Sequence, residues 1–443
     1  MLRTVFIAAL LVLGWGFALQ GPLYAAALYL WIAYFRPETW AWSDIFKTLD
    51  LSYFAGAYLV FRTIFSPARF TFNFRTFLMF LFLGYALLST AVSPHAAYAF
   101  PSWEAFAKTI VVSYLLTVVI TTPSEFRLIL IVIALSLGFE GAKQGWAQLF
   151  LNPGAQNDNG IPFLGDNNLV AVGMMMLLPM TAALGRTAST RWVRLLFYLL
   201  TIGVLYRALS TYSRGGFLAC AAVGLVYWWR SPFKLRTALA GLLAIVIVLP
   251  ALPPAFWTRM STIMAEGGDR DVSTVGRIHF WNVAVSMAND HPVLGVGFNA
   301  YQAAYNDYDT SDSEFGTSRS VHSAWLGVLA EMGYPGLLLY LAIVGLSFAG
   351  CHRVRRQAAR GEIPRELGRY AVGLEAALVA FAVGGTFVPF QYYEMLWHYF
   401  ALTMALEAVA ATEASAVRAR AAVVADAERP VPSFAWGPTA ATR

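Results

Sequence analysis

The sequence predicts an all-α polytopic membrane protein with about twelve transmembrane helices and one large extramembrane loop. Hydrophobic residues make up 58% of the 443 positions and charged residues only 13%, whereas soluble domains carry roughly one quarter charged residues. The mean hydropathy of +0.58 agrees with this class. Apolar runs also recur that are long enough to approach a hydrocarbon core of roughly 30 Å at about 1.5 Å per helical residue.

These apolar runs define the predicted spans in order. After an apolar stretch at 4–35, we expect spans near 51–65, 76–92, 105–122, 128–151, 167–185, 193–209, 217–230, 237–252, 336–350, 370–388 and 396–412. Gln20, Gly21 and Pro22 interrupt the first stretch, which forms either one broken span or a hairpin. One broken span is the preferred interpretation, and it places both termini in the cytoplasm. A hairpin would add a crossing and place the first residue outside.

The basic residues predict the orientation, because cytoplasmic loops carry an excess of Lys and Arg. The segment 351–369 holds six arginines, and 186–192 and 230–236 are also basic. We therefore place these three segments in the cytoplasm. Counting spans from them puts three polar segments on the opposite side, namely 152–168, 210–216 and the loop 253–321. In that loop four arginines stand against eight carboxylates, and the net charge of −4 is consistent with translocation.

This topology predicts four regions, which are an N-terminal bundle at 1–252, the large periplasmic loop at 253–323, C-terminal helices at 324–412 and a disordered cytoplasmic tail at 413–443. Cys220 and Cys351 form no disulfide framework and no zinc-binding spacing. The pI near 9.2 comes from the cytoplasmic loops, so it indicates topology and contact with anionic membrane lipids and no nucleic-acid partner.

Charged residues inside predicted spans need a partner or a ligand, because a charge at the bilayer centre costs at least about 2.5–3.5 kcal/mol. Glu140 and Lys143 lie three residues apart on one helix face, so they form a self-neutralising pair or leave Lys143 to face a bound anion. Asp166, Asn167 and Asn168 stand at a predicted helix start, where a simple N-cap is the alternative to a functional role.

A second polar group lies between two spans on the outer side, in the segment STYSRGG at 210–216. Tyr212 precedes Arg214, whose guanidinium offers a fixed fork of donors for phosphate or carboxylate. Gly215 and Gly216 permit an unusual backbone and a close approach. An arginine that only reaches lipid headgroups is the alternative, but the positive-inside bias disfavours it on this side.

The large loop contains a predicted amphipathic helix that begins near Arg277 and stops at 290–292. Ile278, Trp281 and Val285 share one face, so we expect this helix to lie on the outer membrane boundary.

A tight turn at Gly295 and Gly297 follows the first loop helix. Next to Arg319, Ser320 is the predicted cap of a second helix, and the first turn of that helix holds His322. Trp325, Leu326 and Leu329 pack that helix inward, so His322 faces the polar side at the mouth of the bundle; a histidine satisfied within the core is the alternative.

Four motifs in this order resemble the O-antigen ligase and polymerase superfamily of bacterial envelope enzymes. They are SRGG at 213–216, GRIHFWNVA at 276–284, HPVLGVGFNAY at 291–301 and VHSAWLGVLAEMGYPGLLLYL at 321–341. Within the superfamily the chain is most similar to O-antigen ligases and to the related O-glycosylation ligases, in which an element like Asp166 to Asn168 also recurs. The resemblance as a whole covers about 138–345. Ser323 stands where many members have asparagine.

The resemblance implies a transferase that moves a glycan en bloc from undecaprenyl diphosphate to a sugar hydroxyl of the lipid A core oligosaccharide, on the periplasmic face of the inner membrane, without a cofactor. Negative charge builds on the leaving diphosphate, and fixed guanidinium groups stabilise such charge without a metal. Arg214 and Arg277 are the main candidates for this role, with Arg319 and Lys143 beside them. His322 is the candidate base, which predicts direct displacement with inversion.

Two other chemistries and three other functions are alternatives to this interpretation. A cation held by Asp307, Asp309, Asp312 and Glu314 would need a ligand spacing that these residues lack. A retaining mechanism would need a carboxylate beside the anomeric carbon. An O-antigen polymerase and a protein O-oligosaccharyltransferase would use the same donor. A lipid-glycan transporter should show pseudo-symmetric repeats and charges near the midplane, and neither is found in the sequence.

Overall fold

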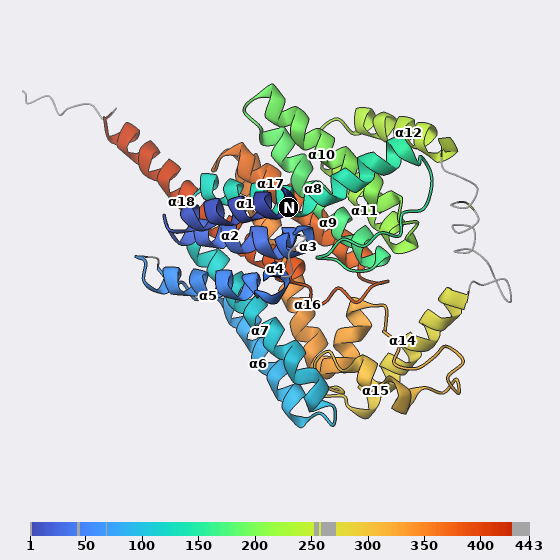
Figure 1. The fold of residues 1–443 in the computed structure, drawn as a ribbon. Coiled ribbons are helices and arrows are strands. Elements are labelled where there is room, and N and C mark those ends of the chain that lie inside the picture. The colour runs from blue at the N-terminus through green and yellow to red at the C-terminus, as the bar shows by residue number, and fades with distance from the viewer. Residues whose placement is uncertain (1, 42–44, 68, 252–256, 258–271, 428–443) are drawn as a thin grey trace, which may run out of the picture.

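The computed structural model describes residues 2–41, 45–67, 69–251, 257 and 272–427, and the regular elements of these residues are helices (Figure 1). The predicted all-α class is therefore confirmed for this part of the chain. The helices are α1 (Leu2–Ala18), α2 (Pro22–Phe35), α3 (Pro37–Trp40), α4 (Ile45–Thr48), α5 (Leu51–Ile64), α6 (Phe74–Val92), α7 (Ala96–Val119), α8 (Pro123–Leu151), α9 (Asn167–Thr187), α10 (Arg191–Leu209), α11 (Arg214–Arg230), α12 (Lys234–Ala251), α14 (Val272–Asp290), α15 (Tyr301–Tyr308), α16 (Ala324–Ala359), α17 (Arg365–Gly384) and α18 (Glu394–Ala427).

Seven helices are long and apolar enough to cross a membrane, among the described residues. They are α6, α7, α9, α10, α16, α17 and α18. The chain is thus a multi-pass membrane protein, while the larger number of about twelve crossings stays a prediction.

The first two helices form a hairpin instead of the single broken span that the sequence analysis preferred. They fold back on each other after Ala18, and Gly14 of α1 packs against Leu28 of α2 so closely that a Cβ on Gly14 would come within 2.8 Å of the Leu28 Cδ1 atom. Each helix is shorter than the roughly 20 residues that span a bilayer.

Two other boundaries differ from the predictions. The predicted span at 336–350 and the predicted helix near His322 are parts of one bent helix, α16, which runs for 36 residues. Its bend lies at Gly333, where φ is 65°, a conformation that an L side chain rarely adopts. Helix α18 continues to Ala427, so 413–427 is helical where disorder was predicted.

The polar segments separate to two ends of the bundle. At one end the three basic segments meet, because Arg369 Nη1 donates to the carbonyl of Arg186 at 2.7 Å, and Arg230 and Arg355 both pair with Glu375. This arrangement joins the three segments that the sequence assigns to the cytoplasm.

The opposite end carries α14 and α15, which lie together beside the ends of α6 and α16 (Figure 1). The predicted loop helix does stop at Asp290. Phe280, Met287, Tyr301 and Tyr305 are buried in an apolar cluster of this region's own. The loop is therefore a packed structure in its described part.

The predicted tight turn is present and is held against α6. Gly295 and Gly297 have φ values of 66° and 118°. A Cβ on Gly295 would come within 2.3 Å of the Glu331 backbone, and one on Gly297 within 2.4 Å of Ser93 Oγ. Ser89 Oγ donates to the Leu294 carbonyl at 2.7 Å. Glycine is required at this turn by both backbone conformation and space.

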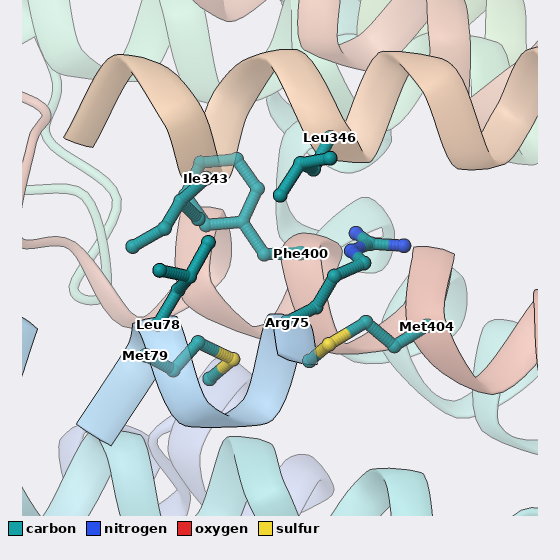
Figure 2. Close-up of a pocket in the computed structure, with 7 residues that line it drawn as sticks. All are labelled: Arg75, Leu78, Met79, Ile343, Leu346, Phe400 and Met404. Atoms are coloured by element: carbon teal, nitrogen blue, oxygen red, sulfur yellow. The ribbon is translucent and has the colours of Figure 1, made fainter. Parts of the chain in front are cut away.

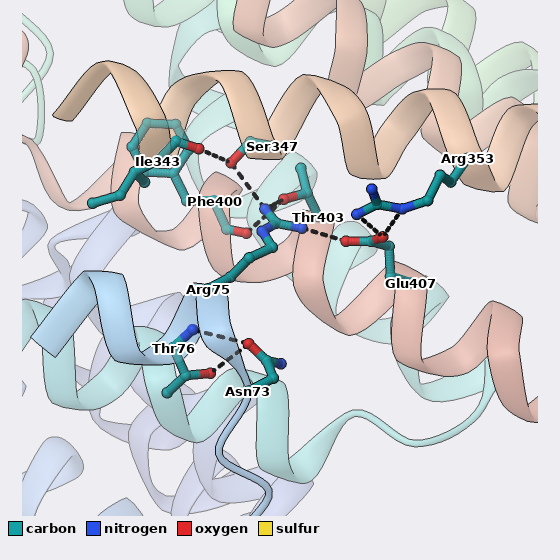
Figure 3. A network of polar contacts seen from close by, with 9 residues as sticks. All are labelled: Asn73, Arg75, Thr76, Ile343, Ser347, Arg353, Phe400, Thr403 and Glu407. Atoms are coloured by element: carbon teal, nitrogen blue, oxygen red, sulfur yellow. Dashed lines mark hydrogen bonds and ion pairs between the residues drawn. The ribbon is translucent and has the colours of Figure 1, made fainter. Parts of the chain in front are cut away.

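A polar network fastens the basic end of α6 to α16 and α18 (Figure 3). Arg75 Nη1 donates to Glu407 Oε2 at 2.5 Å, and its Nη2 donates to Ser347 Oγ at 2.9 Å and to Thr403 Oγ1. Arg353 Nε donates to Glu407 Oε1 at 2.7 Å. The charge of Arg75 is thus compensated where it enters the bundle.

Apolar side chains enclose the stem of Arg75 (Figure 2). The cavity that they leave has about 10 Å³. A cavity needs about that volume to hold a single water molecule. The network therefore joins three helices and offers no space for a ligand.

Candidate functional site

Three helix N-termini meet at the end that carries α14 and α15. Asp166 caps α9 by accepting from the backbone N–H groups of Asn168 and Leu169 at 2.7 and 3.1 Å. Ser213 caps α11 and Ser323 caps α16 through their hydroxyl groups. Because the N-terminus of a helix carries partial positive charge, three of them in one place favour an anion.

The segment Gly385–Phe387 brings two of these helix starts together. Its Gly385 carbonyl accepts from the backbone N–H of Ala324, the first residue of α16, at 2.7 Å. Phe387 packs against the start of α11, where a Cβ on Gly215 would lie 3.0 Å from the Phe387 Cβ. The ring of Trp281 on α14 lies 6.4 Å from that of Phe387. The α17–α18 connection therefore contacts α14 of the loop as well as α11 and α16 of the bundle. The sequence did not predict this role.

The segment STYSRGG provides the third connection, to α9. Ser213 Oγ donates to Asn168 Oδ1 at 2.9 Å, and Asn167 Nδ2 donates to the Thr211 carbonyl at 2.9 Å. The simple N-cap alternative holds for Asp166. The two asparagines do more than that, because they fix α9 to the start of α11.

The backbone of this segment differs from the prediction. Gly215 and Gly216 lie inside the first turn of α11, so they allow close approach without an unusual backbone, and a Cβ on Gly216 would come within 2.6 Å of the Ala171 Cβ. The left-handed residue is Tyr212, with φ of 57°, and its hydroxyl donates to the Gly154 carbonyl. Arg214 is thereby set as the first residue of α11.

His322 does not lie in the first turn of a helix, contrary to the prediction. Ser323 is the N-cap of α16, and Ser320 Oγ instead accepts from the His322 backbone N–H at 3.5 Å. His322 has φ of 50°, which is uncommon for a residue with a Cβ and costs of order 1–3 kcal/mol. Strain of this kind is found where the surroundings dictate the position of a side chain.

The surroundings of His322 keep its imidazole neutral. Burial lowers the pKa of His322 below the usual 6.5, and the positive charge of Arg277 lowers it further. Asp166 raises the pKa in opposition, and Arg319 lowers it by a smaller amount. The His322 ring lies 6.0 Å from the Phe280 ring. The guanidinium of Arg319 lies 5.8 Å from the centroid of the same Phe280 ring. The structure thus brings His322, Arg277, Arg319 and Asp166 into one electrostatic environment.

Trp281 lies on the face that the sequence predicted, but that face is not the one buried in the loop. Ile278 and Val285 expose 42% and 39% of their surface, and Trp281 is half-buried. Phe280 and Met287 on the other face pack into the loop cluster. Helix α14 therefore carries apolar side chains on its buried face and also on its exposed face.

The acidic part of the loop is held by hydrogen bonds. His279 Nε2 lies 2.7 Å from Asp309 Oδ1, while Ser311 Oγ and the Ser313 backbone N–H donate to the same carboxylate at 2.7 and 3.0 Å. Burial raises the pKa of Asp309, but these bonds together hold it well below its usual range. Among the described residues, no three His, Cys, Asp or Glu side chains are grouped as metal ligands. Asp309 serves the loop fold.

Two buried charged residues near the site, Arg207 and Glu331, were not predicted from the sequence. Arg207 is fully buried, and its Nε donates to Gln144 Oε1 at 2.8 Å while its terminal nitrogens donate to the carbonyls of Asn157 and Asn159. It therefore holds the segment that leads into α9. Glu331 is also buried and accepts from the Tyr301 backbone N–H at 3.4 Å. An arginine so close to STYSRGG was the one signal that could have identified Arg207.

The predicted pair of Glu140 and Lys143 is confirmed, at 2.8 Å. Lys143 also lies over the ring of Trp40, with its Nζ 4.1 Å from the ring centroid. Its positive charge is therefore compensated within α8 and against α3.

Comparison with known families agrees with this arrangement. Residues 196–341 match the O-antigen ligase family, and 1–154 match a family of unknown function. The range that matches the O-antigen ligase family contains Arg214, Arg277, Arg319 and His322, whereas Lys143 and Asp166 lie outside it. No curated protein matches the chain.

This match supports a membrane enzyme of the O-antigen ligase and polymerase type. Within the matched range, the start of α11 and the start of α16 both contact the same segment, Gly385–Phe387.

Proposed function

We propose that the chain is an O-antigen ligase that transfers a glycan en bloc from undecaprenyl diphosphate to a sugar hydroxyl of the lipid A core oligosaccharide. The observation that carries this proposal is the meeting of three helix N-termini, with Arg214 as the first residue of α11, beside His322, whose charged surroundings include Arg277 and Arg319. Such a site suits a substrate that carries a diphosphate and reacts by losing it.

The donor diphosphate binds between the start of α11 and the start of α14 in this proposal. Arg214 and Arg277 donate to its oxygens, and Arg319 adds charge from the loop. The helix N-termini add fixed dipoles that need no reorganisation as charge develops on the leaving group. Tyr212, Gly215 and Gly216 support Arg214, and Asp166, Asn167 and Asn168 hold the start of α9 beside it.

His322 takes the proton of the acceptor hydroxyl as that oxygen attacks the anomeric carbon. The C–O bond to diphosphate breaks as the new glycosidic bond forms, and the proton moves to the imidazole. Attack from the face opposite the leaving group gives inversion. The lowered pKa of His322 suits this role, because a base must be neutral before the reaction.

In this proposal the active site is on the periplasmic face of the inner membrane, opposite the basic end of the bundle, because the basic segments are assigned to the cytoplasm. The exposed apolar face of α14, with Ile278 and Val285, then lies toward the polyprenyl chain or the membrane. A thiol introduced by Ser311→Cys should react with an impermeant maleimide from the periplasm, whereas one from Ala358→Cys should not.

The test is transfer by the purified full chain. Lipid-linked glycan is incubated with lipid A core, with a second lipid-linked glycan, or with a pilin-like protein, in the presence of EDTA. We expect glycan on lipid A core alone, with an inverted anomeric bond by NMR. Elongation of the second lipid-linked glycan would identify a polymerase, a glycosylated protein would identify a protein O-oligosaccharyltransferase, and loss of transfer that magnesium restores would overturn the metal-independent mechanism.

A further inference from the structure

A basic cleft lies at the end of the bundle opposite the candidate active site. It has a volume of about 540 Å³ and opens between α9, α11, α16 and α17. Five arginines line it, and they come from the three separate segments that the sequence assigns to the cytoplasm: Arg186, Arg230, Arg355, Arg365 and Arg369. Its lining, all within the described residues, includes no Asp or Glu.

One carboxylate partly compensates these charges from behind the lining. Glu375 is buried and pairs with Arg230, whose Nε donates to it at 3.2 Å, and with Arg355 at 3.4 Å. One negative charge against five positive charges leaves a net charge of +4. The bundle therefore keeps an uncompensated excess of positive charge at this point, which an anion would neutralise.

Fixed contacts hold three of the five arginines of the cleft in place. Arg369 is tied to the Arg186 carbonyl at 2.7 Å, and the Glu375 pairs fix Arg230 and Arg355. Gly368 lets α17 approach α16, since a Cβ there would lie 2.6 Å from the Ala358 Cβ. The remaining arginines, Arg186 and Arg365, are exposed, and within the described residues neither forms an ion pair with a carboxylate.

The ligand chemistry follows from the lining. Guanidinium groups bind phosphate by paired hydrogen bonds, and about 540 Å³ lies within the range of roughly 300–1,000 Å³ that small-ligand sites occupy. Beside Arg230, α11 exposes Trp229 and Leu225, each at 60%, to the surroundings of the bundle. A phosphate with acyl chains can place its charge in the cleft and its chains along that apolar surface.

We propose that this cleft binds the phosphate of an anionic phospholipid headgroup. The site is separate from glycan transfer, and a bound lipid would hold the ends of α9, α11, α16 and α17 together. A soluble phosphate is the other source of the same chemistry, and the experiment distinguishes the two.

The experiment uses the full chain in detergent and native mass spectrometry. Phosphatidylglycerol, phosphatidylcholine and inorganic phosphate are titrated separately. The test variant is Arg186→Gln with Arg365→Gln, which leaves the Glu375 pairs and the Arg186 carbonyl in place. The matched control is Arg191→Gln with Arg194→Gln, which removes two exposed arginines from the same end of the bundle, outside the cleft.

We expect phosphatidylglycerol to bind the parent at least about tenfold more tightly than phosphatidylcholine, and the test variant to lose roughly tenfold while the control changes less than about twofold. Equal weakening in both variants would assign the effect to overall charge and overturn the proposal. Equal binding of the two lipids would do the same. Inorganic phosphate that displaces phosphatidylglycerol at equal affinity would identify a soluble phosphate as the occupant and overturn the lipid source.

Discussion

The two ends of the helical bundle both gather arginines, but three helices present opposite ends to them. At the basic cleft, α9, α11 and α16 present their C-termini and Arg369 donates to a carbonyl there, while α17 begins there with Arg365. At the candidate active site, the same three helices present their N-termini. Arginines at helix C-termini partly cancel the dipoles, whereas arginines at helix N-termini add to them.

The second difference is an imidazole. At the basic end His352 Nδ1 lies 2.7 Å from Arg355 Nη2, and His352 is not part of the cleft lining, whereas the opposite end holds His322 beside Arg277 and Arg319. Positive charge is sufficient to bind phosphate, but glycosyl transfer also needs a group that takes a proton. The comparison therefore separates a binding site from a reacting site, and each prediction below tests one part of that separation.

The largest expected effect is on turnover at His322. Removal of a general base costs about 10²–10⁴ in rate, so His322→Ala should show this loss with little change in apparent donor affinity. His322→Gln keeps size and hydrogen bonding but not basicity, and it should behave like Ala. Single-turnover transfer by monodisperse variants measures the effect. A Gln variant with near-parental rate would make His322 a positioning residue, and the two ends would then differ only in their helix dipoles.

The next effect concerns stability at the basic end. Glu407→Gln leaves Arg75 and Arg353 without their carboxylate; because the Glu407 side chain is 22% exposed and that of Arg353 56% exposed, the cost should be below the about 3–5 kcal/mol of a fully buried pair. Thermal unfolding in detergent should show a clear decrease in the midpoint, whereas Glu413→Gln on the same helix should show little change. If Glu407→Gln unfolds like the parent, the hydroxyls of Ser347 and Thr403 are sufficient for Arg75.

The arginines of the candidate active site should show an intermediate effect. A hydrogen bond to a charged group contributes about 1.5–3 kcal/mol, so Arg277→Ala should lower kcat/KM by roughly 10-fold to 150-fold. Arg277→Lys should rescue poorly, because an ammonium lacks the planar fork of donors. Initial rates at low donor concentration test this, with Arg191→Gln as a control from the opposite end. Full rescue by Lys would mean that diffuse positive charge is sufficient at both ends.

A smaller effect should follow pH. The base acts only when neutral, and the lowered pKa of His322 keeps it neutral at pH 7. Protonation increases as pH falls through that pKa, so turnover should be flat above about pH 6.5 and should fall by up to about tenfold per unit below the pKa. Rates of the parent across this range, with an inverting product at each pH, measure the profile. A rate that falls below pH 7.5 would contradict a lowered pKa.

The sequence predicted the helical class, the separation of basic segments from the opposite polar segments, and the turn at Gly295 and Gly297, because composition, charge bias and glycine chemistry act locally. It also predicted the pairing of Glu140 with Lys143, which depends only on helical spacing. The family resemblance, placed over about 138–345, agrees with the match to the O-antigen ligase family at 196–341.

What the sequence could not give depends on long-range contacts. His322 precedes α16 because the Gly385 carbonyl accepts from Ala324, more than sixty positions earlier in the chain. The role of Gly385–Phe387 follows from packing against both α11 and α16. Arg207 looked like any arginine near a helix end, and only the folded chain brings the carbonyls of Asn157 and Asn159 to it.

The smallest effect is expected at Lys143. Its charge is already engaged by Glu140 at 2.8 Å and by the face of Trp40, and 47% of its side chain is exposed. A partly exposed ion pair contributes about 0.2–1 kcal/mol, so Lys143→Gln should change kcat/KM by less than about fivefold. Donor titration of this variant beside Arg277→Ala gives the measurement. A rise in KM comparable to that of Arg277→Ala would mean that Lys143 leaves Glu140 to bind the diphosphate, and the reacting end would then extend into α8 beyond the O-antigen ligase domain.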